Sequence, residues 1–215
     1  MLNRRTKYLQ VALNSTMGDA HGIIAALPRS ERILVEAGTP LIKAYGQEAI
    51  SRLKGWWGGY VVADLKTMDR GETEATLARL GGADGAICLG EAPIETVNAF
   101  VATCTKLGMD SMVDMMNVEQ PVRILRKLKK LPTVAVLHRG VDEETYNKGK
   151  PIPYVQINKI RSSYDVMISM AGGDEIREVQ RAIFNDANIV VVWKSFYRPA
   201  GDTGTLAGEF LRVIK

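Results

Sequence analysis

The 215-residue sequence contains only two cysteines and two histidines, and this scarcity excludes several classes of site. Cys88 and Cys104 lie in apolar segments without metal-binding spacing. We therefore expect reduced, buried thiols in a cytosolic (cytoplasmic) protein. The sequence has neither a Cys-x-x-Cys nor a His-x-x-x-His pattern, which disfavours zinc.

Long apolar runs and clustered positive charge are also missing. No apolar stretch is long enough to span a membrane, and the basic N-terminus lacks the apolar region of a secretory signal. The net charge of +4 is dispersed, and the densest basic run, residues 123–130, has the spacing of a solvated helix face. We expect no membrane or nucleic-acid partner, whereas a modest positive charge suits an anionic small substrate.

Eight strand-like apolar runs recur at fairly even intervals along the chain. Segments with helical periodicity lie between them, at 46–54, 72–80, 95–107, 120–130, 175–184 and 205–214. This alternation predicts an α/β protein, a single-domain (β/α)₈ TIM barrel over residues 1–215. A doubly wound open sheet is the alternative, but the Gly-x-Gly-x-x-Gly turn typical of it is missing after the first run. The runs are Tyr8–Leu13, Ile33–Glu36, Tyr60–Asp64, Ala86–Leu89, Ser111–Met115, Thr133–Leu137, Val166–Met170 and Ile189–Trp193.

The longest irregular segment, Gly140–Pro153, follows the sixth run. A barrel would place a mobile active-site loop there, and a tolerated surface insertion is the alternative.

The most informative motif is Asp64-x-Lys66-x-x-Asp69, at the end of the third run. Strand residues two positions apart face the same side, so Asp64 and Lys66 should point together. Two carboxylates around one ammonium can hold a metal, lower a pKa and deliver a proton. The alternative is a solvated charge cluster at a strand-to-helix turn.

Other polar residues follow the remaining runs, and in a TIM barrel these strand ends meet at one mouth. Glu36 and Asp64 could supply the hard oxygen ligands that Mg²⁺ prefers. Gly172 and Gly173 would open a helix whose backbone N–H groups hold a phosphate, with Lys194 adding positive charge. Each residue also has a structural alternative, such as helix capping, ion pairing or a tight turn. The strand-end candidates are Asn14, Glu36, Asp64, Lys66, Asp114, His138, Gly172, Gly173, Lys194 and Ser195.

Five segments together resemble one enzyme family. The chain is similar to the orotidine 5′-monophosphate decarboxylase suprafamily, and most similar to its 3-hexulose-6-phosphate synthase and 3-keto-L-gulonate-6-phosphate decarboxylase branches. The Asp-x-Lys-x-x-Asp motif is specific to the suprafamily, and Glu-x-Gly-Thr-Pro with Val-Asp-Met-x-Asn favours the synthase branch. These segments are 9–14, 35–42, 64–72, 112–119 and 137–142.

The resemblance implies a barrel homodimer with shared active sites. It implies Mg²⁺ at Glu36 and Asp64, and a phosphorylated sugar whose phosphate lies by the loops after strands seven and eight. It also implies that Asp69 reaches into the partner subunit's site.

The reaction that the resemblance suggests is an aldol interconversion of ribulose 5-phosphate plus formaldehyde with 3-hexulose 6-phosphate, through an enediolate. His138 would move the proton, Lys66 would stabilise the developing negative charge, and Asp114 would bond substrate hydroxyls. Two alternatives stay open. One is a decarboxylase of the same suprafamily, acting on 3-keto-L-gulonate 6-phosphate or orotidine 5′-monophosphate. The other is a non-catalytic phosphosugar-binding barrel.

The chain departs from the family pattern in two places, one of them a pair of residues. Asn14 stands where relatives usually have aspartate, and Trp193-Lys194 stands where they usually have Gly-Arg. Lysine keeps the positive charge but loses the bidentate fork of arginine. The indole of Trp193 would crowd the phosphate, stack on a ligand or face the helices.

Overall fold

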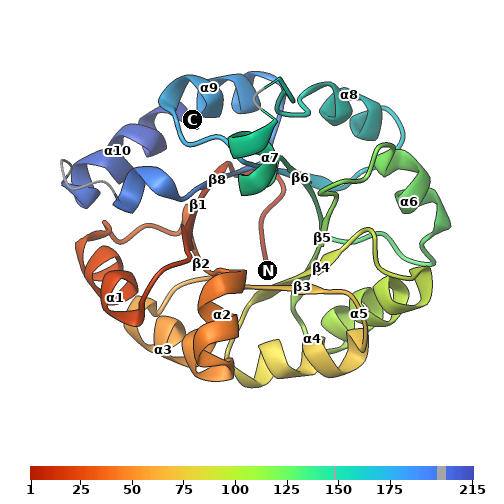
Figure 1. Ribbon diagram of the computed structural model, residues 1–215, viewed down its shortest axis with the longest axis horizontal. Helices are drawn as coiled ribbons and strands as arrows, with labels where there is room; N and C mark the ends of the chain where they lie inside the picture. Colours follow the sequence, from red (N-terminus) through yellow and green to blue (C-terminus); the bar gives the residue numbers. More distant parts are fainter. Residues whose placement is uncertain (148, 198–201) are drawn as a thin grey trace.

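The computed structural model describes residues 1–147, 149–197 and 202–215. Eight parallel strands close into a barrel in chain order, and β8 pairs back to β1 (Figure 1). The predicted (β/α)₈ fold is therefore confirmed, and each predicted strand overlaps an observed one. The strands are β1 (Tyr8–Leu13), β2 (Ile33–Ala37), β3 (Val61–Thr67), β4 (Gly85–Leu89), β5 (Asp110–Asp114), β6 (Val134–His138), β7 (Met167–Ala171) and β8 (Ile189–Val192).

Helices surround the barrel, and all six predicted helical segments are present with shifted ends. The expected irregular segment after β6 contains a short helix, α7, and Lys148 of that segment lies outside the described residues. The helices are α1 (Met17–Ala26), α2 (Thr39–Tyr45), α3 (Gln47–Trp57), α4 (Gly71–Leu80), α5 (Ile94–Lys106), α6 (Pro121–Lys127), α7 (Val141–Tyr146), α8 (Val155–Arg161), α9 (Ile176–Phe184), the 3₁₀ helix η1 (Lys194–Tyr197) and α10 (Thr203–Val213).

Strand alternation divides the buried side chains into two sets. Leu9 and Val11 belong to the core between the strands and the helices, whereas Leu34 and Val62 belong to a smaller cluster inside the barrel. Two residues beyond Leu34 and Val62 the chain carries Glu36 and Asp64. The inward-facing positions of β2 and β3 thus carry apolar residues inside the barrel and acidic residues at its mouth.

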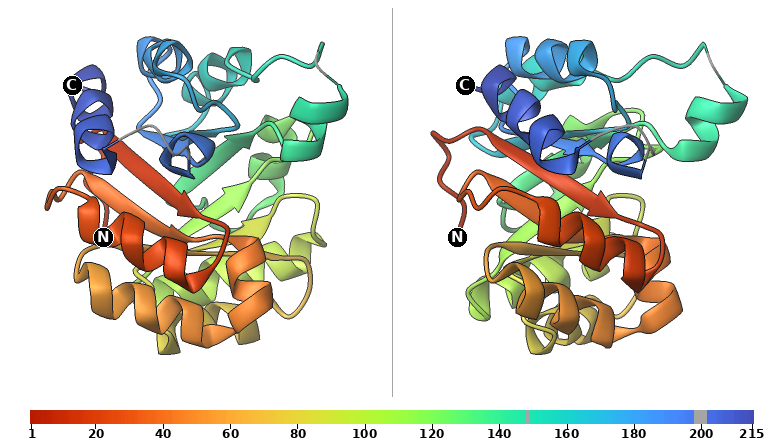
Figure 2. Two further views of the ribbon diagram at one scale, coloured as in Figure 1. Left: turned by 60° about the vertical axis from the view of Figure 1, so that its left-hand side comes forward. Right: turned by 90° about the vertical axis from the view of Figure 1, so that its left-hand side faces the viewer.

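The two ends of the barrel differ. The strands point toward the end where α7 lies, and the N-terminus lies at the opposite end (Figure 2). There Asp110 is fully buried, and its Oδ2 accepts hydrogen bonds from Leu2 N at 2.8 Å and from the Tyr60 hydroxyl at 2.7 Å. The N-terminal segment therefore helps to close this end of the barrel.

Strand β3 is longer than predicted and carries an irregularity. Its pairing with β4 shifts register between Asp64 and Thr67, and Lys66 has a φ of 46°. Positive φ is uncommon for a residue with a side chain, and bulges often re-aim side chains next to functional sites. The bulge thus lies at the motif that the sequence singled out.

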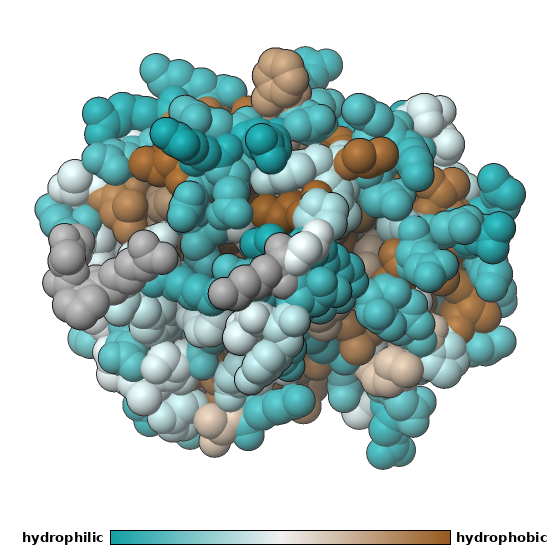
Figure 3. Space-filling view, turned by 45° about the horizontal axis from the view of Figure 1, so that its top comes forward, coloured by the Kyte–Doolittle hydropathy of each residue, from teal (hydrophilic) through white to brown (hydrophobic). Residues whose placement is uncertain are grey.

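The molecular face in Figure 3 is mostly hydrophilic, with apolar side chains scattered among polar ones. Within the described parts of the chain, no helix has both the length and the apolar character to cross a membrane.

Candidate active site

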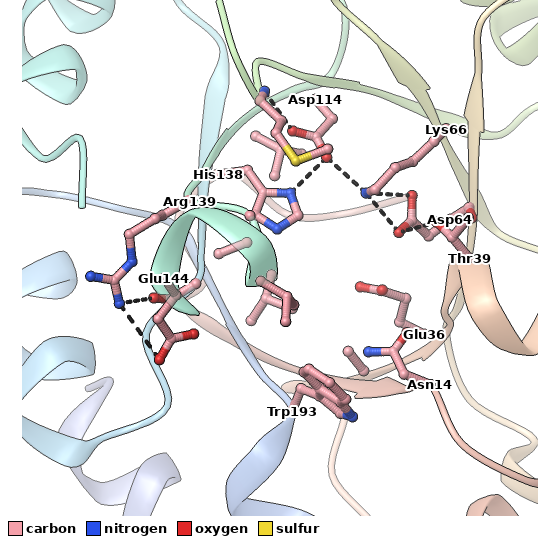
Figure 4. Close-up of a pocket in the computed structure, with 18 of the residues that line it drawn as sticks. Asn14, Glu36, Thr39, Asp64, Lys66, Asp114, His138, Arg139, Glu144 and Trp193 are labelled. Atoms are coloured by element: carbon pink, nitrogen blue, oxygen red, sulfur yellow. Dashed lines mark hydrogen bonds and ion pairs between the residues drawn. The ribbon is translucent and has the colours of Figure 1, made fainter. Parts of the chain in front are cut away.

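A cavity of about 740 Å³ lies at the carboxyl ends of the strands (Figure 4). Eight of the residues predicted at strand ends line it, although they come from seven different strands or the turns that follow them. The convergence that the barrel fold predicts is therefore present in the structure. These lining residues are Asn14, Glu36, Asp64, Lys66, Asp114, His138, Gly172 and Lys194.

The ammonium of Lys66 lies between two carboxylates. Its Nζ is 2.9 Å from Oδ2 of Asp64 and 2.9 Å from Oδ2 of Asp114 (Figure 4). Burial alone lowers the pKa of Lys66, but the two carboxylates outweigh burial and raise it above the ordinary value. Lys66 is thus a fixed cation in the cavity, suited to stabilising negative charge and unsuited to accepting a proton.

His138 is oriented by the same acidic residue. Its Nδ1 lies 2.8 Å from Oδ2 of Asp114, and the other ring nitrogen faces the cavity (Figure 4). Burial lowers the pKa of His138, but the Asp114 carboxylate outweighs this and raises it above 6.5. An imidazole that is held at one nitrogen and open at the other can transfer a proton at the open nitrogen.

Asp114 is almost completely buried, with 1% of its surface exposed. Burial raises the pKa of this carboxyl, but His138 and then Lys66 outweigh burial and hold it far below the usual range. Its Oδ1 accepts a hydrogen bond from Met116 N at 2.9 Å, so both oxygens already have protein partners. This arrangement makes Asp114 the group that positions Lys66 and His138.

Asp64 also lies near a third carboxylate of the cavity wall, that of Glu36. Burial, followed by the negative charge of Asp64, raises the pKa of Glu36 to about 7. The side-chain amide of Gln10 donates to Glu36, while Oε1 of Gln10 is buried and has no partner among the described residues. A pair of close carboxylates beside an unused carbonyl oxygen is a donor set that fits a hard divalent cation.

Thr39, the first residue of helix α2, contacts Asp64. Its hydroxyl lies 2.9 Å from Oδ2 and 2.9 Å from the backbone oxygen of Asp64. The neighbouring Gly38 makes room for Asn14, because a Cβ atom on Gly38 would lie 1.8 Å from Oδ1 of Asn14. The Gly-Thr pair at the start of α2 therefore positions one carboxylate and admits one amide.

The expectation that Gly172 and Gly173 open the helix after β7 is wrong, although the predicted segment 175–184 matches α9 closely. Helix α9 begins at Ile176, after a cap at Glu175, so Gly172 and Gly173 form a turn before the helix. Gly172 has a φ of 92°, and a Cβ atom there would lie 2.3 Å from the backbone oxygen of Arg139. The close approach of these two backbones explains why position 172 is glycine.

The turn after β8 is already bonded to the protein. Trp193 N donates to Oδ1 of Asp174 at 2.6 Å, and Nζ of Lys194 pairs with Oε2 of Glu144 at 2.5 Å. The side chain of Trp193 lines the cavity, on the same side as Asn14 (Figure 4). Of the three placements considered for this indole, the structure therefore excludes the one facing the helices.

Three predicted residues, Asp69, Gly173 and Ser195, are not among the described residues that line the cavity. Asp69 is exposed, and its Oδ1 accepts a hydrogen bond from the adjacent Arg70 N. The carboxylates that flank Lys66 are those of Asp64 and Asp114, and not that of Asp69. Gly173 lines a small separate hollow, and the hydroxyl of Ser195 donates to the backbone oxygen of Asp174. The single chain does not bring these three to the site.

Several residues that shape the cavity were not singled out from the sequence. Thr39 and Glu144 lie on helices α2 and α7, and Asp174 lies in the turn after β7. Thr39 could have been found, because it directly follows the Glu36-Ala-Gly segment. Glu144 and Asp174 left no signal, because acidic residues near helix starts are common.

Comparison with known proteins places the chain in a family. The model of the Orotidine 5′-phosphate decarboxylase / HUMPS family matches residues 7–193. The chain is 35% identical over 213 residues to a bifunctional enzyme Fae/Hps of Methanocella arvoryzae, covering 97% of this chain and 53% of that protein. It is 37% identical over 214 residues to the Fae/Hps of Methanosphaera stadtmanae, covering 96% and 52%.

The chain thus spans about half the length of these curated relatives. A crystal structure of 3-hexulose-6-phosphate synthase superposes with a TM-score of 0.87 at 28% identity, covering 97% of this chain and all of that one. Since the family model covers the barrel from the residue before β1 to the residue after β8, the chain belongs to the Orotidine 5′-phosphate decarboxylase / HUMPS family.

Proposed function

We propose that this chain is a Mg²⁺-dependent carbon–carbon lyase that interconverts ribulose 5-phosphate plus formaldehyde with 3-hexulose 6-phosphate. The observation that carries the proposal is the Lys66–Asp114–His138 arrangement, in which one buried carboxylate holds a fixed cation and a proton-transfer group. The similarity to the Fae/Hps proteins and to the solved 3-hexulose-6-phosphate synthase supports the same reaction.

In the synthetic direction, the open nitrogen of His138 removes a proton from C1 of ribulose 5-phosphate. Lys66 stabilises the negative charge of the resulting enediolate, because its ammonium is fixed beforehand and stays protonated. C1 then forms the new bond to the formaldehyde carbon, and the formaldehyde oxygen takes up a proton. In the reverse direction the same bond breaks and formaldehyde leaves.

Glu36 and Asp64 are the residues that would hold Mg²⁺, with the orphaned Oε1 of Gln10 beside them. When bound, the ion would supply Lewis-acid polarisation of the substrate's oxygen atoms. Among the described residues there is no cluster of three or more His, Cys, Asp or Glu side chains suited to a metal. Two carboxylates suffice for Mg²⁺, because water and substrate oxygens usually complete its shell.

A formaldehyde-release assay with hexulose 6-phosphate tests the proposal. Release that stops with EDTA and returns with excess Mg²⁺ is the expected result. Carbon dioxide released from 3-keto-L-gulonate 6-phosphate or orotidine 5′-monophosphate, without formaldehyde from the hexulose, would contradict the proposed reaction in favour of a decarboxylase. Saturable binding of phosphosugars without any turnover would indicate a non-catalytic barrel.

We further propose that the chain works as a homodimer in which the exposed Asp69 acts in the partner's site. Mixing inactive Lys66→Met and Asp69→Asn subunits tests this, because each mixed dimer would contain one intact site. We expect recovery of up to about a quarter of wild-type activity after subunit exchange. No recovery would place Asp69 in its own subunit's site or outside catalysis.

A further inference from the structure

The β7–β8 end of the cavity presents positive groups that already have internal anionic partners. The ammonium of Lys194 pairs with Glu144, and the backbone N–H of Trp193 donates to Asp174. All four residues line the same cavity. A lysine and a backbone N–H at the carboxyl ends of barrel strands are donors that suit an anionic group of a ligand.

The two carboxylates reach this end from different elements. Glu144 projects from α7, which buries none of its residues, and Asp174 lies in the turn between β7 and α9. Arg139 lies near Glu144, with its Nη2 3.9 Å from Oε1 (Figure 4). The ion pair between Glu144 and Lys194 thus joins α7 to the start of η1, directly after β8.

Neither carboxylate has a part in the proton transfer or charge stabilisation described above. Asp174 is partly withdrawn from solvent, and burial raises its pKa despite the backbone N–H groups of Trp193 and Lys194. Burial therefore disfavours the charged form of Asp174, the group that accepts from the Trp193 N–H. Two negative side chains also repel any dianion that approaches the same donors.

We infer that Glu144 and Asp174 act as internal counter-anions that a ligand's phosphate must displace from Lys194 and from the Trp193 N–H. They are specificity-determining residues of the cavity, which weaken binding of anionic ligands and leave neutral ligands unaffected. This inference rests on the proposed function only in taking a phosphorylated sugar as the ligand. Displacement of Glu144 would also break the ion pair between α7 and Lys194.

Isosteric variants test the inference without changing side-chain size. Glu144→Gln and Asp174→Asn each remove one negative charge, and Asp142→Asn is the matched control. Asp142 lies on the same helix α7 and lines the same cavity. Among the described residues, the partners of Lys194 and of the Trp193 N–H are Glu144 and Asp174, and Asp142 contacts neither donor. Calorimetric titration with inorganic phosphate, ribulose 5-phosphate and unphosphorylated ribulose gives Kd values that do not depend on turnover.

We expect Glu144→Gln and Asp174→Asn each to lower the Kd for phosphate and ribulose 5-phosphate by roughly three- to tenfold, with more in the double variant. Asp142→Asn should change these values by less than about twofold, and ribulose should bind all variants equally. Equal gains in Asp142→Asn would overturn the inference, because long-range charge would then explain them. Unchanged or weaker phosphate binding in both Glu144→Gln and Asp174→Asn would also overturn it.

Thermal melting of each variant checks that it is folded. If the wild type releases no formaldehyde, the proposed reaction fails, but the inorganic phosphate titrations still decide the inference.

Discussion

His138 and Lys66 both contact the same oxygen atom of Asp114, at 2.8 Å and 2.9 Å. Asp114 itself is buried, and its other oxygen is bonded to the backbone of Met116. One carboxylate therefore sets the separation of the two groups and the charge of each. This relationship generates distinct predictions for the lysine and for the histidine.

Replacing Lys66 by methionine should abolish most of the catalysis. The variant keeps an unbranched side chain only one atom shorter but removes the fixed cation, and we expect kcat to fall by about 10²–10³-fold, as for the loss of one oxyanion-stabilising donor. Steady-state kinetics measure this change, and circular dichroism checks folding at the assay temperature.

Lys54→Met is the matched control for Lys66→Met. Lys54 also pairs with an aspartate, Asp84, at 2.6 Å, but it lies on α3 outside the cavity. Its loss should cost at most about 1 kcal/mol of stability and leave kcat unchanged. An equal loss of kcat in both variants would show that Lys66 acts only through folding.

The pH dependence of turnover should report His138. Because the Asp114 carboxylate raises the pKa of His138, the imidazole stays protonated to a higher pH than an ordinary histidine. Proton removal needs the neutral form, so kcat/KM should rise with pH through a midpoint above 6.5. In Asp114→Asn the carboxylate is lost while burial remains, so the midpoint should move downward.

Proton NMR can follow this titration directly, because the chain has only two histidines. His21 is exposed on α1 and does not line the cavity, so it serves as the internal reference. A His138 midpoint that is identical in the wild type and Asp114→Asn would refute the assigned pairing.

Much of this site follows from strand alternation alone. Once Leu34 and Val62 face the barrel interior, Glu36 and Asp64 must face it too, because the strand period is two. The sequence therefore predicted which strand ends converge. The bulge at Lys66 was not predictable, because its positive φ depends on the pairing of β3 with β4.

Contacts between loops were also beyond the sequence. The partners of Lys194 and of the Trp193 N–H lie on α7 and in the turn after β7, distant in sequence. No periodicity links such segments, since loop conformation depends on tertiary packing. The role given to the glycine pair failed for a related reason: the cap at Glu175, and not Gly172 or Gly173, determines where α9 begins.

Thr39→Val should weaken metal activation while leaving the chemistry nearly intact. The change removes the hydroxyl 2.9 Å from Oδ2 of Asp64, and the carboxylate loses a partner that orients it. We expect the Mg²⁺ concentration for half-maximal activity to rise roughly 10–100-fold, with kcat at saturating Mg²⁺ little changed. Thr39→Ser restores the hydroxyl and should restore the activation constant. A serine variant as weak as the valine variant would indicate lost packing of the threonine methyl group instead.

Trp193→Gly should tighten the binding of phosphorylated ligands. Nζ of Lys194 lies 5.7 Å from the centre of the Trp193 ring, and the ring itself lines the cavity. Removing a cation–π contact of about 0.5–1 kcal/mol frees the lysine for an anion, which corresponds to a roughly two- to fivefold lower Kd. Removing the bulk of the indole acts in the same direction, because the ligand can approach the backbone N–H of residue 193 more closely. Trp193→Phe keeps an aromatic ring and should stay near the wild-type Kd. Calorimetric titration with ribulose 5-phosphate measures all three proteins, and equal affinity in wild type and Trp193→Gly would show that the indole does not hinder the ligand.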